Sequence, residues 1–534
     1  MRIARPKIHA AAEHGFTMIV TLIVLLISSL LMAAAFAAAT GDVHLTRNDT
    51  YAKKAYYAAQ AGVSNYAFHL NADFNYWTYC KAAGNEALNL YGETPLKTRA
   101  VPGSTDEKYA IQLLPATTAP ENDKKCDVNN PVATMIESGT ANTGTFRIES
   151  TGYSGHEKRT ILATFAHTSF LNYLYYTQYE TLDPVTYSPA RYQCEAYRGV
   201  RPEPPECENI QFVSADVVNG PLHTEDEASI CGEPTFGRNS GDRIEFKRGT
   251  VSAGSGCPNA PHYLGTLIPP AEVPSFEPPP SNTSLKNTPG AFKYEGKTLI
   301  TLEGATMKVT NNKGETKSVG LPPSGAVVYV SNGLSPTCSK AYTPYNPSYT
   351  TDTACGNVYV SGKYTVPLTI GAENDIVIKG SLVPPLENGA PSTNAVLGLI
   401  ANNFVRIYHP VSSGSGINNS SSECNATNLT ESNDPNKWGS LTNPEIYAAI
   451  LAVNHSFIVD NFRCGSPLGS LNLHGAIAQI FRGTVGTHNG SSIASGYSKG
   501  YVYDNRLEVE SPPYFLNPVH ASWFAKREVL APNP

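Results

Sequence analysis

The hydrophobic pattern divides the chain into one long apolar segment and a much longer series of short strands. From His14 to Gly41 no residue is charged, and 16–40 is apolar at most positions. As a helix, 16–40 would be about 37 Å long, enough to cross a hydrocarbon core of about 30 Å. Lys and Arg precede the segment and Asp42 follows it, which predicts a cytoplasmic amino terminus with the rest of the chain outside.

The helical pattern continues past the apolar segment. Apolar side chains recur at helical spacing at Val63, Tyr66, Ala67 and Leu70. Small residues form a second stripe, which we expect to let another helix approach closely, at Ala55, Ala59 and Gly62. We therefore predict one helix over 16–70. A cleaved secretory signal ending near Ala37 is the alternative, although its apolar region would be unusually long.

The pattern changes from helical spacing to alternation after residue 70. In 145–170, apolar and polar positions alternate on both sides of a Gly-containing turn, which predicts a β-hairpin within a membrane-proximal head over 71–170. Residues 171–210 are rich in Tyr and Pro. We interpret them as a packed connector rather than an aromatic platform for carbohydrate.

From 211 to 523, short Val, Ile, Leu, Tyr and Thr segments are separated by Gly, Asn and Ser. This pattern favours a β-solenoid (β-helix), with a β-sandwich as the runner-up because the repeat length is irregular. Residues 524–534 are expected to form a C-terminal tail. The fold class is therefore α+β, a long amino-terminal helix followed by a mainly β head.

Composition and charge agree with this division. The 534 residues include 43 Gly and 40 Pro, and only 16% are charged, which argues against a coiled coil, a helical bundle or a disordered acidic chain. The net charge is −6 and no Lys/Arg block is present, so nucleic acid is not expected as an obligatory partner.

All ten cysteines follow the apolar segment, as expected for disulfides in an exported region. Pairing neighbours in order predicts five local bridges: Cys80 with Cys126, Cys194 with Cys207, Cys231 with Cys257, Cys338 with Cys355, and Cys424 with Cys464. Structural zinc is disfavoured because no two cysteines have the spacing of zinc ligands. No metal site is predicted.

The amino-terminal residues carry a family resemblance. The segment EHGFTMIVTLIVLLISSLLMAAAFAAAT resembles the class III leader and membrane helix of type IV pilins and pseudopilins. AYYAAQAGVSNYAFHL, the hairpin over 145–165 and the YDNRL…PPYF residues near the end are similar to parts of PilX-type minor pilins. The resemblance implies a leader over 1–15, cleavage between Gly15 and Phe16 by a prepilin peptidase, and methylation of the new amino terminus.

One departure from the family bears on the expected role. Major pilins carry Glu at the fifth mature position, where this sequence has Val20. The resemblance therefore implies a rare minor or tip-type subunit whose partners are the membrane and other pilin helices. Its head would lie at the cell surface or on a pilus and would serve assembly priming, adhesion or DNA capture, with a carbohydrate, DNA or protein ligand.

Enzymatic alternatives rest on a few short fragments. Polysaccharide-active β-helix enzymes need clustered carboxylates. The nearest candidates are the strand residues Arg406, Tyr408 and His409, and Asp460 with Arg463, where Asp460 is expected to cap a turn. His223 with Glu225, Asp226 and Glu227 is expected to be a solvated loop.

Two further motifs match active or metal sites only in part. Residues 434–445 match a calcium loop incompletely, and GYSKG at 496–500 is expected to be a flexible loop. We predict a non-catalytic protein with no catalytic residues and no cofactor. The alternatives are an anchored or secreted carbohydrate-binding β-helix and, less favoured, a polysaccharide-active enzyme.

Overall fold

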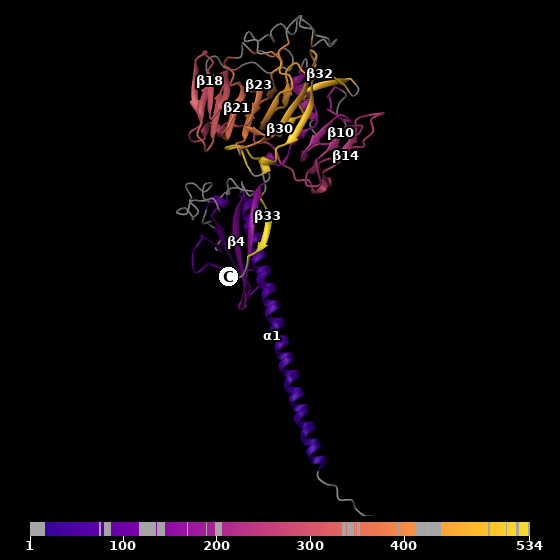
Figure 1. Ribbon diagram of the computed structural model, residues 1–534, viewed down its shortest axis with the longest axis vertical. Helices are drawn as coiled ribbons and strands as arrows, with labels where there is room; N and C mark the ends of the chain where they lie inside the picture. The colour runs from indigo at the N-terminus through magenta and orange to yellow at the C-terminus, as the bar shows by residue number, and fades with distance from the viewer. Residues whose placement is uncertain are drawn as a thin grey trace, which may run out of the picture.

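The computed structural model describes residues 16–73, 76–79, 87–116, 135, 145–167, 169–187, 190–197, 206–333, 338, 347, 349, 353–393, 395–411, 424, 439–489, 492–508, 510–519 and 523–531. A long helix leads into a small sheet, and a large stack of strands lies beyond that sheet (Figure 1). We call this stack, strands β6 to β32, the head.

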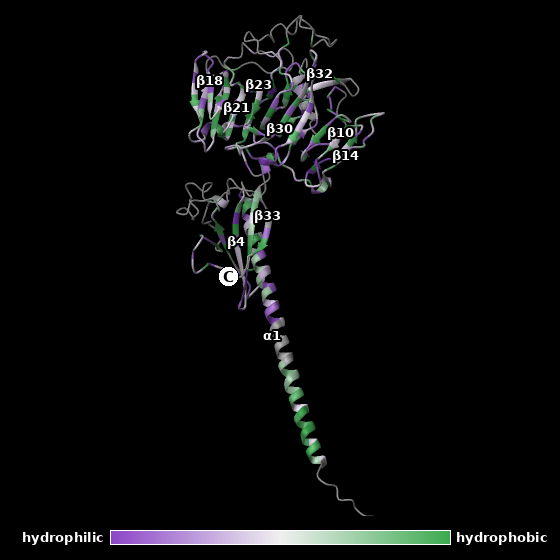
Figure 2. Cartoon of the chain, in the orientation of Figure 1, coloured by the Kyte–Doolittle hydropathy of each residue, from purple (hydrophilic) through white to green (hydrophobic). Residues whose placement is uncertain are grey.

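Helix α1 (Phe16–Ala72) has 57 residues and confirms the single helix predicted over 16–70. At 1.5 Å per residue it is about 85 Å long. Its first half is strongly hydrophobic and its second half is mixed, as Figure 2 shows. The mixed half lies against the small sheet, so the apolar half projects away from the rest of the molecule.

The small sheet has the order β1-β3-β4-β5-β33, with β2 paired to β3. Its strands are β1 (Leu88–Asn89), β2 (Arg99–Ala100), β3 (Lys108–Leu114), β4 (Phe146–Ser154), β5 (Glu157–His167) and β33 (Trp523–Leu530). Strands β4 and β5 form the predicted antiparallel hairpin, and its turn uses Gly155 at φ 57°.

Strand β33 corrects the prediction of a C-terminal tail over 524–534. It pairs antiparallel with β5, from Trp523 opposite His167 to Leu530 opposite Ile161. The physical reason is that β5 would otherwise present a long unpaired edge. The sheet beside α1 is therefore built from both ends of the chain.

The core between α1 and the small sheet confirms one helical stripe and corrects the other. Val63, Tyr66 and Leu70 are buried there with strand residues. The small-residue stripe was expected to face another helix, but β4 occupies it instead. A Cβ atom placed on Gly152 would lie 2.0 Å from the carbonyl oxygen of Ala55.

The head consists mainly of one 22-stranded sheet and one three-stranded sheet. Its strands are β6 (Tyr175–Tyr179), β7 (Phe212–Val213), β8 (Val217–Asn219), β9 (Leu222–Thr224), β10 (Ala228–Cys231), β11 (Thr235–Phe236), β12 (Arg243–Phe246), β13 (Thr250–Ser252), β14 (His262–Tyr263), β15 (Thr266–Ile268), β16 (Phe292–Glu295), β17 (Thr298–Gly304), β18 (Thr306–Thr310), β19 (Thr316–Gly320), β20 (Ala326–Ser331), β21 (Val358–Tyr364), β22 (Leu368–Ala372), β23 (Ile376–Val383), β24 (Leu386–Glu387), β25 (Ala390–Pro391), β26 (Leu397–Ala401), β27 (Val405–Ile407), β28 (Glu445–Ala452), β29 (Phe457–Val459), β30 (Pro467–Phe481), β31 (Gly486–Asn489) and β32 (Ser492–Tyr503).

Short 3₁₀ helices connect several of these elements. They are η1 (Tyr76–Tyr79), η3 (Phe170–Asn172), η4 (Pro184–Thr186), η5 (Tyr192–Tyr197), η6 (Pro270–Glu272), η7 (Thr283–Asn287) and η9 (Asn505–Glu508).

Strand β32 contains GYSKG, so the prediction of a flexible loop there is wrong; these residues pair with β30 in parallel.

Parallel pairing repeats through the head. Strands β7, β8 and β9 pair in turn with β10, β11 and β12, which pair with β13, β14 and β15. One column of apolar residues runs in register through ten strands: Phe292, Val328, Ile370, Leu399, Ile450, Ile477, Tyr175, Leu222, Ile244 and Leu267. Between its two ends every member is buried, so the column forms the axis of the core.

The chain does not follow this column in order. It enters at β6, in the middle, and builds outward to β15. It then crosses to β16 at the other end and builds back until β30 pairs with β6 and β32 pairs with β8. We call the contact of β30 and β32 with β6 and β8 the seam.

The expected connector over 171–210 contains a core strand, β6, because Tyr175 and Tyr176 are buried within the head.

Candidate functional site

The apolar half of α1 is the first candidate functional surface. Within the described residues, Thr17–Ala37 is a helical segment long and apolar enough to cross a membrane, and none of it is buried. Phe36 is 75% exposed and Met18 is 69% exposed. Side chains of this kind require either lipid or other apolar helices around them.

Three hydroxyl side chains within this apolar half are satisfied by the helix itself. The hydroxyls of Thr21, Ser28 and Ser29 donate to the carbonyl oxygens of Met18, Leu25 and Leu26 at 2.9, 3.1 and 2.8 Å. Hydroxyls bonded in this way cost little in an apolar environment, whereas free ones would cost several kcal/mol. The segment is therefore compatible with lipid along its length.

Charged side chains lie where α1 reaches the small sheet. Lys53 forms an ion pair with Asp49 at 2.7 Å, and Lys54 forms one with Glu107 at 2.9 Å. The hydrogen bond from Lys54 lowers the pKa of the Glu107 carboxyl, and the reciprocal bond raises the pKa of the Lys54 ammonium. These charged pairs indicate that the helix faces water from about residue 49 onward.

The predicted processing site lies at the start of this helix. Phe16 is its first residue, and Gly15 lies outside the described residues. Val20, which stands where major pilins carry Glu, is 41% exposed. The helix therefore presents no carboxylate at that position.

Among the residues that the structure describes there are four disulfides, and each joins two cysteines that are neighbours in the sequence order, as predicted. They are Cys194–Cys207, Cys231–Cys257, Cys338–Cys355 and Cys424–Cys464. The predicted partners Cys80 and Cys126 lie outside the described residues. All four bridges close loops of 13 to 40 residues within the head.

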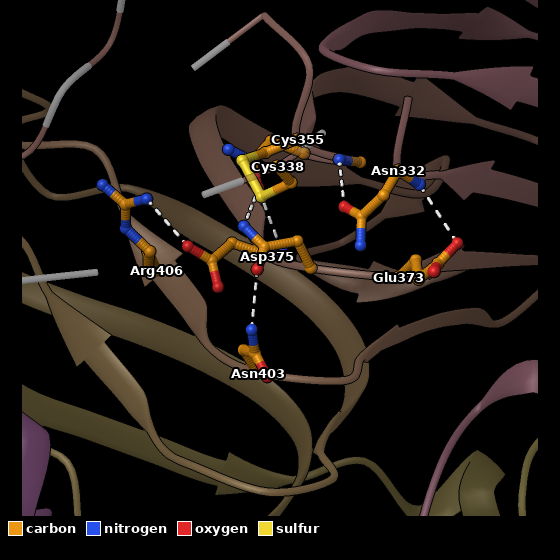
Figure 3. The surroundings of a disulfide bond; sticks show 10 residues. Asn332, Cys338, Cys355, Glu373, Asp375, Asn403 and Arg406 are labelled. Carbon is orange, nitrogen blue, oxygen red and sulfur yellow. Dashed lines mark hydrogen bonds and ion pairs between the residues drawn. A yellow bond between two sulfur atoms is a disulfide. The ribbon is translucent and has the colours of Figure 1, made fainter. Parts of the chain in front are cut away.

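Arg406 is the centre of the first buried charge cluster in the head. Its guanidinium donates to Asp460 at 2.9 and 3.0 Å and to Asp375 at 3.0 Å, and the Tyr349 hydroxyl donates to Asp460 at 2.7 Å. Burial raises the pKa of Asp375 despite the neighbouring Arg406. Figure 3 shows Arg406 and Asp375 beside the Cys338–Cys355 disulfide.

The sequence brought only part of this cluster together. The sequence pattern puts Arg406 and Asp460 on strands that could face one side. It predicts that Asp460 caps a turn, and it gives no signal for Asp375. The structure shows both carboxylates buried and occupied by one guanidinium. His409 is buried as well, and burial lowers its pKa to about 4. This arrangement holds strands together and offers a polysaccharide no accessible carboxylate pair.

His223 forms the second cluster, and the prediction of a solvated loop there is wrong. It lies on β9 with no exposed surface, because Tyr176 and Glu245 flank it in register on β6 and β12. Its Nδ1 lies 2.7 Å from Glu245 and its Nε2 lies 3.0 Å from Glu225. Burial alone would lower the pKa of His223, but the two carboxylates raise it by more, so the net pKa is raised.

Arg482 forms the third cluster, at the seam. Its guanidinium lies 3.2 Å from Glu180, donates to the Ile210 carbonyl at 3.0 Å and stacks 3.7 Å above the Phe212 ring. Lys499 of β32 pairs with Asp216 at 2.8 Å. Residues near the end of the chain thus neutralise carboxylates near the start of the head.

Other sequence candidates do not form a site in the part of the chain that the structure describes. No group of three His, Cys, Asp or Glu side chains is placed there to hold a metal. In the partial calcium loop, Asp434 and Asn436 lie outside the described residues, and Glu445 accepts a hydrogen bond from Asn472. Tyr175 and Tyr176 are buried and so provide no aromatic platform.

Comparison with solved structures finds a weak structural likeness. The chain is similar to the crystal structure of the competence-associated pilin ComZ from Thermus thermophilus. The sequences are 12% identical, the alignment covers 90% of this chain and 98% of that one, and the TM-score is 0.26. No protein-family model and no curated protein sequence matches the chain.

Proposed function

We propose that this protein is a non-catalytic minor pilin-like subunit of a type IV pilus or a related filament, of the PilX type. One observation carries the proposal: α1 is a single helix whose membrane-length apolar half is entirely unburied while its second half is packed on a sheet. A helix of this kind can wait in the membrane and later exchange lipid for other apolar helices.

The proposed route begins with insertion, with residues 1–15 as a leader in the cytoplasm. A prepilin peptidase removes the leader between Gly15 and Phe16, and the new amino terminus is methylated. The domain limits are 16–70 for the assembly helix and 71–170 for the membrane-proximal head, to which β33 adds a strand.

We propose further that the head is a β-solenoid displayed outside the cell. Support comes from the parallel pairing of successive strands and from the ten-residue apolar column. Disulfides suit such an exported unit. It would present its outer surface for assembly priming, adhesion or DNA capture, while its buried charge clusters serve stability rather than catalysis.

Replacing Gly15 tests the proposed route. Gly15→Val should block processing, so that the full 534-residue chain stays in the membrane and is missing from sheared filament fractions. Ala12→Val, a similar change within the leader but away from the cleaved bond, is the matched control and should be processed normally. Appearance of Gly15→Val in the filament fraction at the wild-type level would refute the route.

A further inference from the structure

Both ends of the head attach to neighbouring strands of the small sheet. The chain leaves β5 at His167 to enter the head, and it returns at Trp523, directly opposite His167, to form β33. About 355 residues separate these two positions along the chain. The small sheet therefore receives its last strand only after the whole head has been made.

The folded head holds the two ends of this long insertion together. The Tyr503 hydroxyl, at the end of β32, donates to the Leu171 carbonyl in η3 at 2.5 Å. At the seam, Ile477 of β30 donates its amide to Leu174 at 2.8 Å. When the head is closed, the Tyr503–Leu171 hydrogen bond shortens the connection between His167 and Trp523. It then consists of about 24 residues, those from His167 to Leu171 and those from Tyr503 to Trp523.

A segment after β32 is also fixed on the head. Arg506 donates to the Thr393 and Ala395 carbonyls at 2.9 and 2.6 Å, and the Thr369 hydroxyl donates to Pro513. Val519 donates its amide to Glu277 at 2.8 Å. This contact with the head lies only four residues before Trp523, which directs the returning chain to the edge of β5.

Loop-closure entropy converts this geometry into a coupling. The probability that two chain ends meet falls with the three-halves power of the loop length. Shortening the loop from about 355 to about 24 residues favours the pairing of β33 with β5 by roughly 60-fold. The fixed segment ending at Val519 adds to that factor.

We propose that β33 is a latch that couples closure of the head to completion of the small sheet. Since β33 also lies against α1, an open head would leave the support of the assembly helix incomplete. Resting on the proposed function, this latch would favour incorporation of subunits whose heads are closed.

Hydrogen exchange on the full chain in detergent tests the coupling. Arg482→Met removes the cation that pairs with Glu180 at the seam, and Lys308→Met, at an exposed position of β18, is the matched control. The amide of Leu162 faces β33, because amides alternate in direction along an antiparallel strand. Its exchange rate should rise by up to about 60-fold in Arg482→Met and should not change in Lys308→Met. Fast exchange at Ile477 with wild-type exchange at Leu162 would overturn the proposal.

A second pair of variants tests the coupling from the other side, because coupling between sites is reciprocal. Ala531 donates its amide to Thr160, so alternation points the Val529 amide toward β5 and the Leu530 amide away. Val529→Pro should therefore speed exchange at both Leu162 and Ile477, whereas Leu530→Pro should not. If Val529→Pro leaves Ile477 unchanged, the latch is refuted. This readout needs no filament, so its failure is distinct from failure of the pilin-like role.

Discussion

At the scale of single residues, buried charges in the head lie next to opposite charges from strands far away in sequence. Arg406 contacts Asp375 and Asp460, and Arg482 contacts Glu180. Removing one member of such a group leaves an uncompensated charge in a low dielectric, which costs far more than losing a surface pair. Each cluster therefore fixes the register of the strands that carry it.

Arg406→Met should lower the free energy of unfolding by about 3–5 kcal/mol, because Asp375 and Asp460 would stay buried without a cation. Arg159→Met is the control: its pair with Glu157 at 3.1 Å is partly exposed, so its loss should cost less than about 1 kcal/mol. Urea denaturation of the full chain in detergent measures both. Equal effects of the two substitutions would contradict the assigned role of Arg406.

His223 predicts a pH dependence. Its pKa is raised in the folded protein above the value of about 6.5 expected in the unfolded chain. Its stabilising contribution is therefore complete below about pH 6.5 and is lost as the pH rises through the folded pKa. The difference in the free energy of unfolding between wild type and His223→Gln should therefore shrink as the pH rises above about 6.5. The same substitution at the exposed His262 is the control, and a difference that grows with pH would contradict the prediction.

The charge clusters show where prediction from sequence ends at this scale. Asp460 and Arg406 were recognised as possible neighbours because each lies on or just after a strand of similar pattern. Asp375 was missed, since its position depends on the in-register pairing of β23 with β27. Pattern alone predicts an exposed loop around His223 because an acidic, polar stretch is usually exposed, whereas in the structure Glu225 and Glu245 form hydrogen bonds with the buried imidazole.

At the scale of elements, the packing of α1 on β4 depends on close backbone approach. Gly152→Ala places a Cβ atom 2.0 Å from the Ala55 oxygen and 2.3 Å from the Ala59 nitrogen, so helix and strand must separate. We expect a loss of at least about 1–3 kcal/mol in the free energy of unfolding. Gly320→Ala, at a strand position with open space around it, should change stability by less than about 0.5 kcal/mol. Thermal denaturation compares the two, and similar melting temperatures would count against this packing.

Local elements were predictable because their signals are local. The long helix follows from the continuous apolar run over 16–40, from the helical spacing of apolar residues over 63–70 and from the absence of Pro between them. The β4–β5 hairpin follows from alternation around one turn. Strands β6 and β33 were assigned to a connector and a tail. Both form by pairing with strands distant in sequence, so their own residues carried too weak a pattern to identify them.

At the scale of the whole molecule, the chain closes on itself twice. The seam joins β30 to β6 within the head, and β33 joins β5 within the small sheet. A sequence of short strands predicts that they stack, but it does not reveal that the chain enters the stack in the middle. That order depends on contacts across some three hundred residues, which local patterns do not encode.

In the proposed route, α1 begins a mature, filament-competent subunit. Amino-terminal sequencing of the protein recovered from its native membrane tests it most directly. The proposal predicts that the mature chain begins at Phe16, with the apolar helix intact. A start near residues 38–42 would mean that the apolar segment is a cleaved secretory signal, and it would contradict the pilin-like role.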